Sequence, residues 1–402
     1  MTVTASGSGA ATIRDLCEEA IGHLSSFEHG SASPGERRAA EWIAARLEQE
    51  GAREVRIEEE RAHGTYWWPL GLLALGGGLA ALSRRRSVRL LGGAAAAAGI
   101  ADDVSGGRLW FRRAVLPQRP TWNVVAESGD PDADRTVVVV AHHDAAHWSL
   151  LFAPHLPALA GRRFPRLLER TNSTPPVMLP VVGGPLLVAL SGLLGSSRLR
   201  RLGAVLSFGT AVTMAEIGSR SVVPGANDNL SGVATVLALA RTLRERPVSG
   251  VRVLLVSTGS EESFMEGMQA FARRHFPVLP IERTHVICVD TVGSPKLMQL
   301  EGEGMLVMRD YPEAFKALVS DVAAREGVTL VRGMRFRNAT DGLIALKAGY
   351  PTVMLGSVNE FKAPANYHWP SDTAENVVLD SVLDCARVCD GTIRRLGEAT
   401  TG

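Results

Sequence analysis

The chain has 402 residues and a formal net charge of +1, because 43 basic residues nearly balance 42 acidic ones. This length allows one large α/β domain with additions, or two smaller domains. The near-neutral charge excludes a strong overall field that would gather nucleic acid, so we expect no nucleic-acid partner.

The predicted elements begin with a helix. The N-terminus MTVTASGSGAATIRDL lacks a basic segment followed by an apolar one, so we expect no cleaved signal peptide. Residues 33–50 have apolar side chains at helical spacing behind a Ser-Pro-Gly start, which predicts an amphipathic helix packed on a sheet. Residues 54–59 alternate as a strand, but the next strand-like segment, 121–127, follows only after a long apolar block. We therefore expect an insertion between two neighbouring strands.

Two uncharged apolar segments, residues 66–82 and 176–196, indicate membrane contact, and the second is long enough for a bilayer, which takes roughly 20 residues to cross. Weaker apolar segments follow each of them, at 90–101 and 202–217. We interpret each pair as a helical hairpin that leaves the membrane on the side it entered, with an arginine-rich turn at its tip. The tip residues are Arg84, Arg85, Arg86, Arg89, Arg198, Arg200 and Arg201. The alternatives are buried core helices, or a hydrophobic lid or dimer surface.

The positive-inside rule places these arginine turns in the cytoplasm, which predicts a multi-pass protein of the cell membrane with its α/β domain on the extracytoplasmic side. Other arginines flank the opposite ends of the apolar segments and oppose this orientation: Arg108, Arg112, Arg113, Arg162, Arg163, Arg166 and Arg170. Trp67, Trp68, Trp110 and Trp148 suit a membrane interface, although packed core aromatics have the same composition.

A continuous β-branched run, TVVVVA at residues 136–141, predicts a central strand covered on both faces. Residues 251–257, 285–289 and 352–355 have the same character, and helical segments such as 233–244 separate them. This alternation predicts an α/β three-layer sandwich with a mixed, mostly parallel central sheet.

Cys385 and Cys389 lie one turn apart in a predicted C-terminal helix, where we expect buried thiols rather than a metal site. The four cysteines, which include Cys17 and Cys288, indicate no redox compartment.

The first candidate metal ligand follows TVVVVA directly, in the sequence His142-His143-Asp144. A neutral imidazole binds zinc well, and a carboxylate two residues further on can hold the ring through its other nitrogen. We predict His142 as a ligand and Asp144 as its supporting partner, with His143 facing the opposite side. By itself, this pattern more often marks a structural histidine.

Four further sites lie at predicted strand ends or turns. Asp228 is in the turn PGANDN, where an isolated aspartate would be a helix cap. Glu261 and Glu262 are adjacent carboxylates that repel unless one binds a cation while its neighbour handles protons. Asp290 ends the apolar run HVICVD and needs a partner, and His368 lies in YHWPSDT. Two histidines and three carboxylates suit a pair of zinc ions bridged by one aspartate, and the absence of HExxH excludes the single-zinc helical arrangement.

The ordered motifs AHHD, PGANDN-x-SG, SEE, VDTVG and YHWPSDT resemble the M28 metallopeptidases, as does SPGERRAAEWIAARLEQEG near the N-terminus. The resemblance implies a zinc-exopeptidase-like fold and two Zn²⁺ ions. One ion would be held by His142, Asp228 and Asp290, and the other by Asp228, Glu262 and His368. Glu261 would be the general base for a metal-bridging hydroxide, the Asp228–Asn229 peptide would be cis, and Asp341, Gly342 and Tyr367 would lie near the substrate.

The chain departs from the family pattern after Glu262, where residues 263–268 are bulkier, and in the long separation of His142 from Asp228. The first departure predicts a reshaped wall near the site, and the second coincides with an apolar block. We therefore expect residues 1–62, 119–149 and 219–402 to form the peptidase domain, and residues 63–118 and 150–218 to be inserted apolar hairpins.

The sequence thus predicts a membrane-associated di-zinc aminopeptidase or exopeptidase whose partners are a peptide substrate and a lipid bilayer. The alternatives are another di-zinc amide hydrolase, such as an M20-like deacylase or a cyclase, and an inactive membrane module on the same fold. Substrate preference and oligomeric state stay open at this point.

Overall fold

A 7-stranded sheet in the order β1-β2-β4-β3-β5-β10-β6 forms the centre of the computed structural model, which describes residues 12–398. The expectation about the N-terminal segment therefore concerns, in part, residues 1–11, outside the described range. Strands β4, β3, β5 and β10 are parallel to one another, whereas β1, β2 and β6 pair in antiparallel fashion. The predicted mixed α/β sheet is confirmed. Its strands are β1 Arg53–Ala62, β2 Arg119–Gly129, β3 Thr136–His142, β4 Arg252–Thr258, β5 Thr284–Val289, β6 Lys296–Gln299 and β10 Thr352–Val358.

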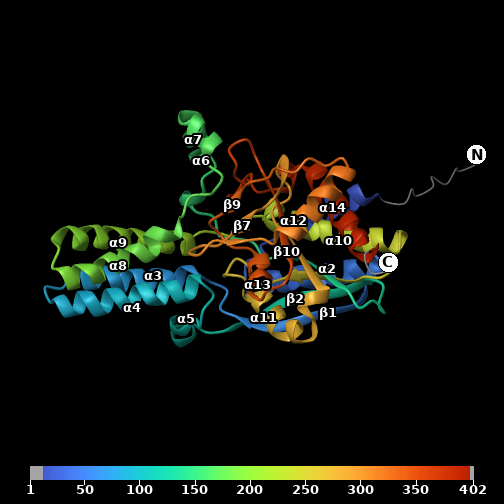
Figure 1. The fold of residues 1–402 in the computed structure, drawn as a ribbon. Helices are drawn as coiled ribbons and strands as arrows, with labels where there is room; N and C mark the ends of the chain where they lie inside the picture. Colours follow the sequence, from blue (N-terminus) through green and yellow to red (C-terminus); the bar gives the residue numbers. More distant parts are fainter. Residues whose placement is uncertain (1–11, 399–402) are drawn as a thin grey trace, which may run out of the picture.

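Helices cover both faces of this sheet (Figure 1). One face packs against α1 Ile13–Leu24, α2 Pro34–Gln49, α10 Ser231–Glu245, α12 Glu313–Arg325 and α14 Leu379–Glu398. The other face packs against α11 Glu266–His275, α13 Asp341–Lys347 and the near ends of the apolar helices described below. Short helical turns complete the connections: η3 Phe276–Val278, η4 Ile281–Arg283 and η5 Ala374–Asn376. The result is a three-layer sandwich.

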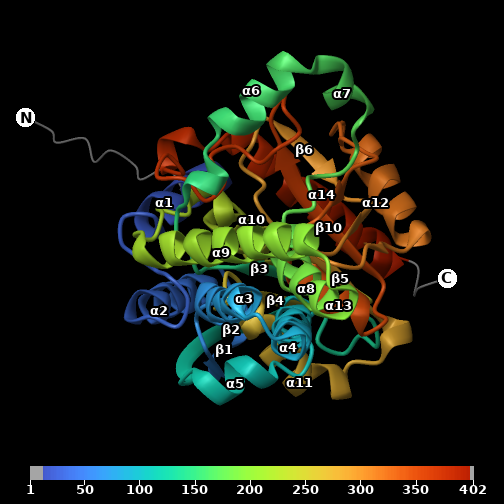
Figure 2. The same cartoon turned by 90° about the vertical axis from the view of Figure 1, so that its left-hand side faces the viewer.

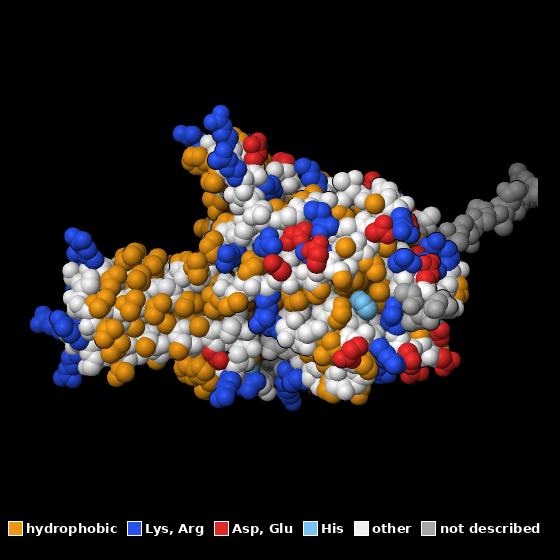
Figure 3. All heavy atoms as spheres, in the orientation of Figure 1, with side chains coloured by type: hydrophobic (Ala, Val, Ile, Leu, Met, Phe, Trp, Pro, Cys, Tyr) orange, Lys and Arg blue, Asp and Glu red, His pale blue; other side chains and the backbone are white. Residues whose placement is uncertain are grey.

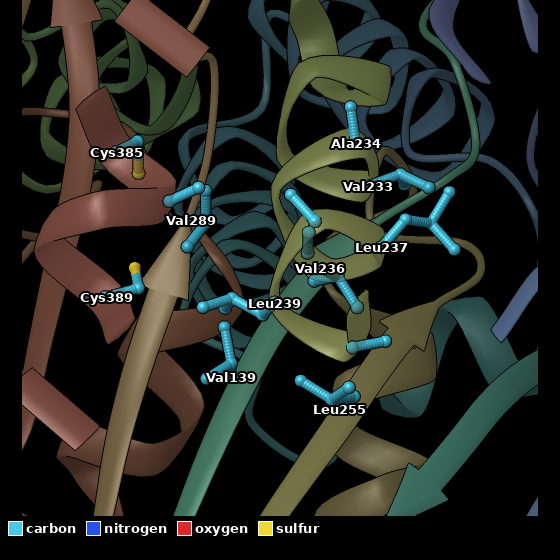
Figure 4. Packing of buried hydrophobic residues seen from close by; sticks show 14 of the residues in the cluster. Val139, Val233, Ala234, Val236, Leu237, Leu239, Leu255, Val289, Cys385 and Cys389 are labelled. Carbon is cyan, nitrogen blue, oxygen red and sulfur yellow. The ribbon is translucent and has the colours of Figure 1, made fainter. Parts of the chain in front are cut away.

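The core lies where α10 is enclosed between the sheet and α14 (Figure 4). Val139, Leu255 and Val289 from three parallel strands face the helix, and Leu237 and Leu239 of α10 are fully buried. Burying each such leucine or valine contributes about 1.5–3 kcal/mol. Both cysteines of α14 are also fully buried, as expected for thiols in this position, and burial raises the pKa of the Cys385 thiol.

A second, 3-stranded sheet in the order β8-β7-β9 lies beside the main one. Its strands are β7 Gly302–Glu303, β8 Arg309–Asp310 and β9 Arg335–Phe336. The sequence did not predict these elements, because two-residue strands are too short to show an alternating pattern. They bring residues 303 and 336–340 close to the carboxyl ends of the parallel strands.

Four apolar helices pack side by side and project from the sandwich (Figures 1 and 2). This bundle consists of α3 Trp67–Leu82, α4 Arg86–Val104, α8 Met178–Leu194 and α9 Ser197–Ser219. The apolar segment predicted at residues 176–196 forms a shorter continuous helix, α8. It has 17 residues, because prolines precede it and Gly195, at φ 72°, ends it. Within residues 12–398, α9 is the one helix that is both long and apolar enough to cross a membrane.

Two smaller elements lie where the bundle joins the sandwich. Helix α5, Trp110–Val115, follows α4. On the other side of the bundle, η1 Leu150–Phe152, α6 His155–Arg163 and α7 Pro165–Arg170 form an arm that projects away from the sandwich (Figures 1 and 2). We call residues 150–170 the α6–α7 arm.

Candidate metal centre

His142 is the last residue of β3, and its ring is buried at the carboxyl edge of the sheet. Its Nδ1 lies 3.0 Å from the backbone carbonyl oxygen of Asp144. This contact leaves Nε2 directed at Asp228, whose Oδ1 is 3.3 Å away, and towards Asp290, whose Oδ2 is 3.9 Å away. The next residue, His143, makes its contact elsewhere, with its Nδ1 2.9 Å from Ser257 Oγ. The alternation along β3 therefore places one histidine in the site and one outside it.

Asp228 lies in a kinked turn, η2 Ala226–Leu230, that leads into α10. The Asp228–Asn229 peptide bond is cis, as the family resemblance implied. The turn is held by the carboxylate of Asp372, which accepts hydrogen bonds from the backbone amides of Asn227 (2.8 Å) and Asp228 (3.1 Å). Sequence analysis missed this function of Asp372, because its partners lie far away along the chain and no local motif connects them.

Glu261 and Glu262 follow β4 in a turn that is fixed by a second buried carboxylate. Asp144 accepts hydrogen bonds from the backbone amides of Glu261 (2.9 Å) and Glu262 (3.1 Å), and from Ser31 Oγ (2.5 Å). Its carboxylate Oδ1 is 3.5 Å from His142 Nδ1, further than its own carbonyl oxygen. The carboxylate of Asp144 therefore supports the glutamate turn more directly than the histidine ring.

Asp290 and His368 complete the cluster from two other directions. Asp290 follows β5, and its backbone amide donates to the carbonyl of Leu355 in β10. His368 Nε2 lies 3.2 Å from Asp228 Oδ2 and 3.1 Å from Glu262 Oε1. The ring of Tyr367 stacks on the ring of His368, with centroids 3.9 Å apart. Of the residues that the resemblance placed near the substrate, Tyr367 is thus beside the cluster.

These side chains form two overlapping triads: His142, Asp228 and Asp290, and Asp228, Glu262 and His368. Within each triad the potential ligand atoms lie within 4.8 Å of one another. Asp228 belongs to both, and its buried Oδ2 accepts no well-formed hydrogen bond despite its proximity to His368. Imidazole nitrogens and carboxylate oxygens at this spacing are suitable zinc ligands, and such close carboxylates require cations or protons between them. The residues present therefore fit metal ions.

The pKa shifts show that Asp290 and Glu261 resist ionisation, whereas His368 favours its charged form. Burial and the neighbouring Asp228 charge raise the pKa of Asp290 to about 7. Burial also raises the pKa of Glu261 well above its usual value, against the charge of His142. Burial alone would lower the pKa of His368, but the charge of Glu262 and a hydrogen bond with Asp228 raise it to about 10. Without cations, the buried carboxyl groups of the site cannot all be ionised at the same time.

A cavity of about 20 Å³ opens beside the cluster. Its walls include Glu261, Asp290 and Tyr367 on the polar side and Phe336 and Met354 on the apolar side. Asp341 and Gly342, which the resemblance placed near the substrate, do not line this cavity; Asp341 instead accepts a short hydrogen bond from Thr258 Oγ1.

The bulky segment 263–268 connects the glutamate turn to the apolar bundle. Arg112 of α5 is fully buried and donates from Nη1 to the carbonyl of Ser263 (2.8 Å). Phe264 stacks on Tyr66, with ring centroids 5.0 Å apart, at the start of α3. The departure from the family pattern therefore coincides with contacts to α5 and to the start of α3.

Comparison with known proteins agrees with this arrangement. Residues 210–393 match the model of peptidase family M28, a stretch that contains Asp228, Glu261, Glu262, Asp290 and His368 but begins after His142. No curated protein matches the sequence.

Solved structures match almost the whole chain. An aminopeptidase from Aneurinibacillus sp. strain AM-1 has 14% identity and a TM-score of 0.54, with 95% of this chain and 93% of that chain covered. A glutaminyl cyclase from Tannerella forsythia has 15% identity and a TM-score of 0.56, with 95% and 98% covered. A zinc aminopeptidase from Bacillus subtilis has 12% identity and a TM-score of 0.55, with 95% of both chains covered. At these identities the neighbours show the fold, and the family match covers residues 210–393, the part of the chain that resembles peptidase family M28.

Proposed function

We propose that the chain is a membrane-anchored metallopeptidase that uses two zinc ions to remove residues from the end of a peptide. The observation that carries this proposal is the pair of triads that share Asp228, with Glu261 next to them. His142, Asp228 and Asp290 would hold one ion, and Asp228, Glu262 and His368 the other. Bound there, zinc ions would supply Lewis acidity, which polarises a peptide carbonyl and acidifies water.

Glu261 is the proposed general base. Its Oε2 lies 3.9 Å from His142 Nε2, and its side chain lines the cavity beside both triads. From this position it can take a proton from the attacking water and later return it to the leaving amine. The amide hydrogen bonds to Asp144 orient the turn, so Asp144 is proposed as a positioning residue rather than a proton carrier.

The cavity supports an exopeptidase rather than an enzyme that cuts within long chains. It is small, and the apolar residues Phe336 and Met354 are among those that line it. A single terminal residue would need less rearrangement to enter it than an extended chain would. Two solved neighbours are described as aminopeptidases, which agrees with this assignment.

Glutaminyl cyclases with the same fold provide a second candidate activity. Cyclisation releases ammonia from an N-terminal glutamine without cutting the peptide, whereas hydrolysis consumes water and releases a free amino acid. A panel of aminoacyl-p-nitroanilides alongside a glutaminyl peptide separates the two. We expect amine release from several aminoacyl substrates; ammonia release from the glutaminyl peptide alone would contradict the peptidase assignment.

The two adjacent glutamates provide a matched test of the site. We expect Glu261→Gln to retain bound zinc while turnover falls by about 10²–10⁴-fold, the usual contribution of a general base. The same change at the next residue, Glu262→Gln, should instead lower zinc content, because it removes a proposed ligand. Metal analysis and kcat measured on both variants check this contrast. Near-normal turnover in Glu261→Gln would rule out its function as the base.

We further propose that the bundle anchors the chain in a membrane. Its helices have 16, 19, 17 and 23 residues, or about 24–35 Å at 1.5 Å per residue, against a hydrocarbon thickness of about 30 Å. Apolar side chains cover the sides of the bundle, and basic residues gather at its far end (Figure 3). The exposed apolar residues include Leu72, Leu75, Leu79, Leu82, Leu91, Leu186, Leu193, Leu194, Leu202, Val205 and Val212. A soluble surface rarely exposes such a continuous apolar area.

The packing between the helices also supports a membrane setting. A Cβ atom on Gly93 would lie 2.5 Å from the backbone nitrogen of Ala189, and one on Gly192 would lie 2.5 Å from that of Leu90. Close approach of backbones through small residues is typical of membrane helices. In this proposal residues 63–118 and 150–218 are insertions into a peptidase domain formed by 1–62, 119–149 and 219–402.

Orientation follows from labelling at the bundle tip. Arginines lie at the tip, but arginines of α5 and of the α6–α7 arm lie at the opposite end, near the sandwich. A cysteine at Ser87 reports the side directly, because the native cysteines are buried. Reaction with an impermeant maleimide only after permeabilisation would place the tip inside and the peptidase domain outside.

A further inference from the structure

The α6–α7 arm combines exposed apolar side chains with exposed basic ones. Leu156, Leu159, Phe164 and Leu167 are 44%, 65%, 55% and 64% exposed. Four exposed arginines accompany them, at positions 162, 163, 166 and 170, and the one acidic residue of the arm is Glu169. Short helices with leucine, phenylalanine and arginine on their surface are typical of segments that lie in the headgroup region of a bilayer.

The position of the arm matches this composition. It leaves the molecule where the bundle joins the sandwich, and it extends across the direction of the bundle rather than along it (Figure 1). In the view along the bundle, the arm lies on one side and α5 on the other (Figure 2). Helix α5 also carries an exposed tryptophan, Trp110, beside the exposed Arg113. With the bundle in a membrane, both elements would lie at the level of its surface.

The arm is in contact with the loop that carries His368. At its root, the Phe152 ring meets the His368 ring edge-on, with centroids 4.7 Å apart. Near the C-terminal end of the arm, Lys362 Nζ donates to the carbonyl of Leu168, and to that of Thr171 just beyond the arm, each at 2.8 Å. Residues 359–368 are therefore held between the two ends of the arm. These contacts connect the arm to a proposed zinc ligand.

We propose that the α6–α7 arm binds the surface of an anionic phospholipid bilayer and thereby holds the His368 loop in its active position. This proposal rests on the membrane anchoring proposed above. The charge of the arm complements anionic headgroups, and its apolar residues continue the apolar surface of the bundle at the membrane level. Each arginine near an anionic surface favours binding by roughly fivefold, about 1 kcal/mol.

The experiment uses the full chain in nanodiscs of phosphatidylcholine, with or without phosphatidylglycerol. A cysteine introduced by Leu159→Cys is labelled with an environment-sensitive fluorophore, which is selective because the native cysteines are buried. In discs with phosphatidylglycerol, we expect the fluorophore emission to shift to the blue and become stronger. For the unlabelled protein, we expect a higher kcat on an aminoacyl-p-nitroanilide in these discs than in discs of phosphatidylcholine alone. The triple variant Arg163→Gln, Arg166→Gln, Arg170→Gln should lose both responses while still entering the discs through its bundle.

The matched control changes three exposed arginines on α12 and α14, away from the bundle: Arg325→Gln, Arg387→Gln and Arg395→Gln. It alters net charge equally and should respond to phosphatidylglycerol like the wild type. An unchanged fluorophore signal, or a triple arm variant that still responds, would overturn the proposal. A blue shift of the fluorophore that appears without phosphatidylglycerol and grows with protein concentration would also overturn it, since a second copy of the chain would then cover the arm. If the protein does not enter the discs at all, the proposed anchoring by the bundle is wrong. If it enters the discs but hydrolyses no substrate, the peptidase assignment is wrong, and the fluorescence response still tests whether the arm binds lipid.

Discussion

Two buried carboxylates hold the main chain at the proposed metal ligands in the same way. Asp144 accepts the successive amides of Glu261 and Glu262, and Asp372 accepts the successive amides of Asn227 and Asp228. Each carboxylate thus fixes the backbone at a ligand rather than the ligand side chain. Burial, with the charge of Asp228, raises the pKa of Asp372 to about 8, whereas its amide hydrogen bonds favour the ionised form. Such outer contacts decide how well the ligands are preorganised.

We expect Asp372→Asn to weaken zinc affinity by about 10–100-fold, the usual effect of losing an outer-shell partner. The asparagine side chain has an NH₂ group in place of one carboxylate oxygen, and this group cannot accept a hydrogen bond from a backbone amide. The turn at Asp228 therefore loses one of its two hydrogen bonds. Competition with a fluorescent chelator measures the affinity without relying on activity. Asp321→Asn, an exposed residue on α12, is the control. Equal affinities for the two variants would show that Asp372 does not position the ligand.

At the scale of elements, a buried polar cluster joins the bundle to the turn that carries Glu261 and Glu262. Arg112 of α5 makes a bidentate ion pair with Asp103 at the end of α4, and its Nη1 lies 3.6 Å from Glu266 of α11. Glu266 also accepts from the backbone amide and Nδ1 of His63, just before α3. Burial raises the pKa of Glu266, but His63 and Arg112 outweigh this and lower it. Three helices and the segment between β1 and α3 therefore share one set of charges next to Glu261 and Glu262.

Arg112→Met should destabilise the protein by about 3–5 kcal/mol, because it leaves two buried carboxylates without their cation. The neighbouring Arg113 is exposed, so Arg113→Met should change stability by about 0.5 kcal/mol or less. Thermal and chemical unfolding in detergent compares the two. Adding Asp103→Asn to Arg112→Met should recover part of the loss, and strictly additive effects would argue against a coupled pair.

At the scale of the whole molecule, the main question is whether water or lipid surrounds the bundle. Its near end belongs to the same apolar core as one face of the sheet, through residues such as Leu70, Ile100 and Met214. Its sides continue outwards with exposed leucines and valines. Substitutions on this surface therefore have different costs in the two settings.

Charged residues on α9 distinguish the settings. Val205 and Val212 are 68% and 69% exposed, so Val205→Asp and Val212→Asp should be nearly neutral in water. Within a bilayer each aspartate should cost about 2.5–3.5 kcal/mol, and the protein should leave the membrane fraction. The control pair, Val278→Asp and Val307→Asp, lies on the sandwich with exposures of 73% and 70%. If both pairs distribute between membrane and soluble fractions like the wild type, membrane insertion of the bundle is wrong.

The sequence by itself determined six of the seven strands of the central sheet, all except β6, because β-branched runs such as 136–141 predict buried strands whatever surrounds them. Its motifs at strand ends also indicated the family whose model residues 210–393 match, since these motifs keep their order along the chain. Only the tertiary structure decided which groups act on one another. Asp372 and Asp228 are linked by a hydrogen bond across 144 residues, and Arg112 meets Ser263 across 151. Local patterns carry no information about such contacts, because these depend on how the helices and strands pack. For the same reason, the sequence showed two apolar hairpins, but only packing brought them together as one bundle with the α6–α7 arm at its base.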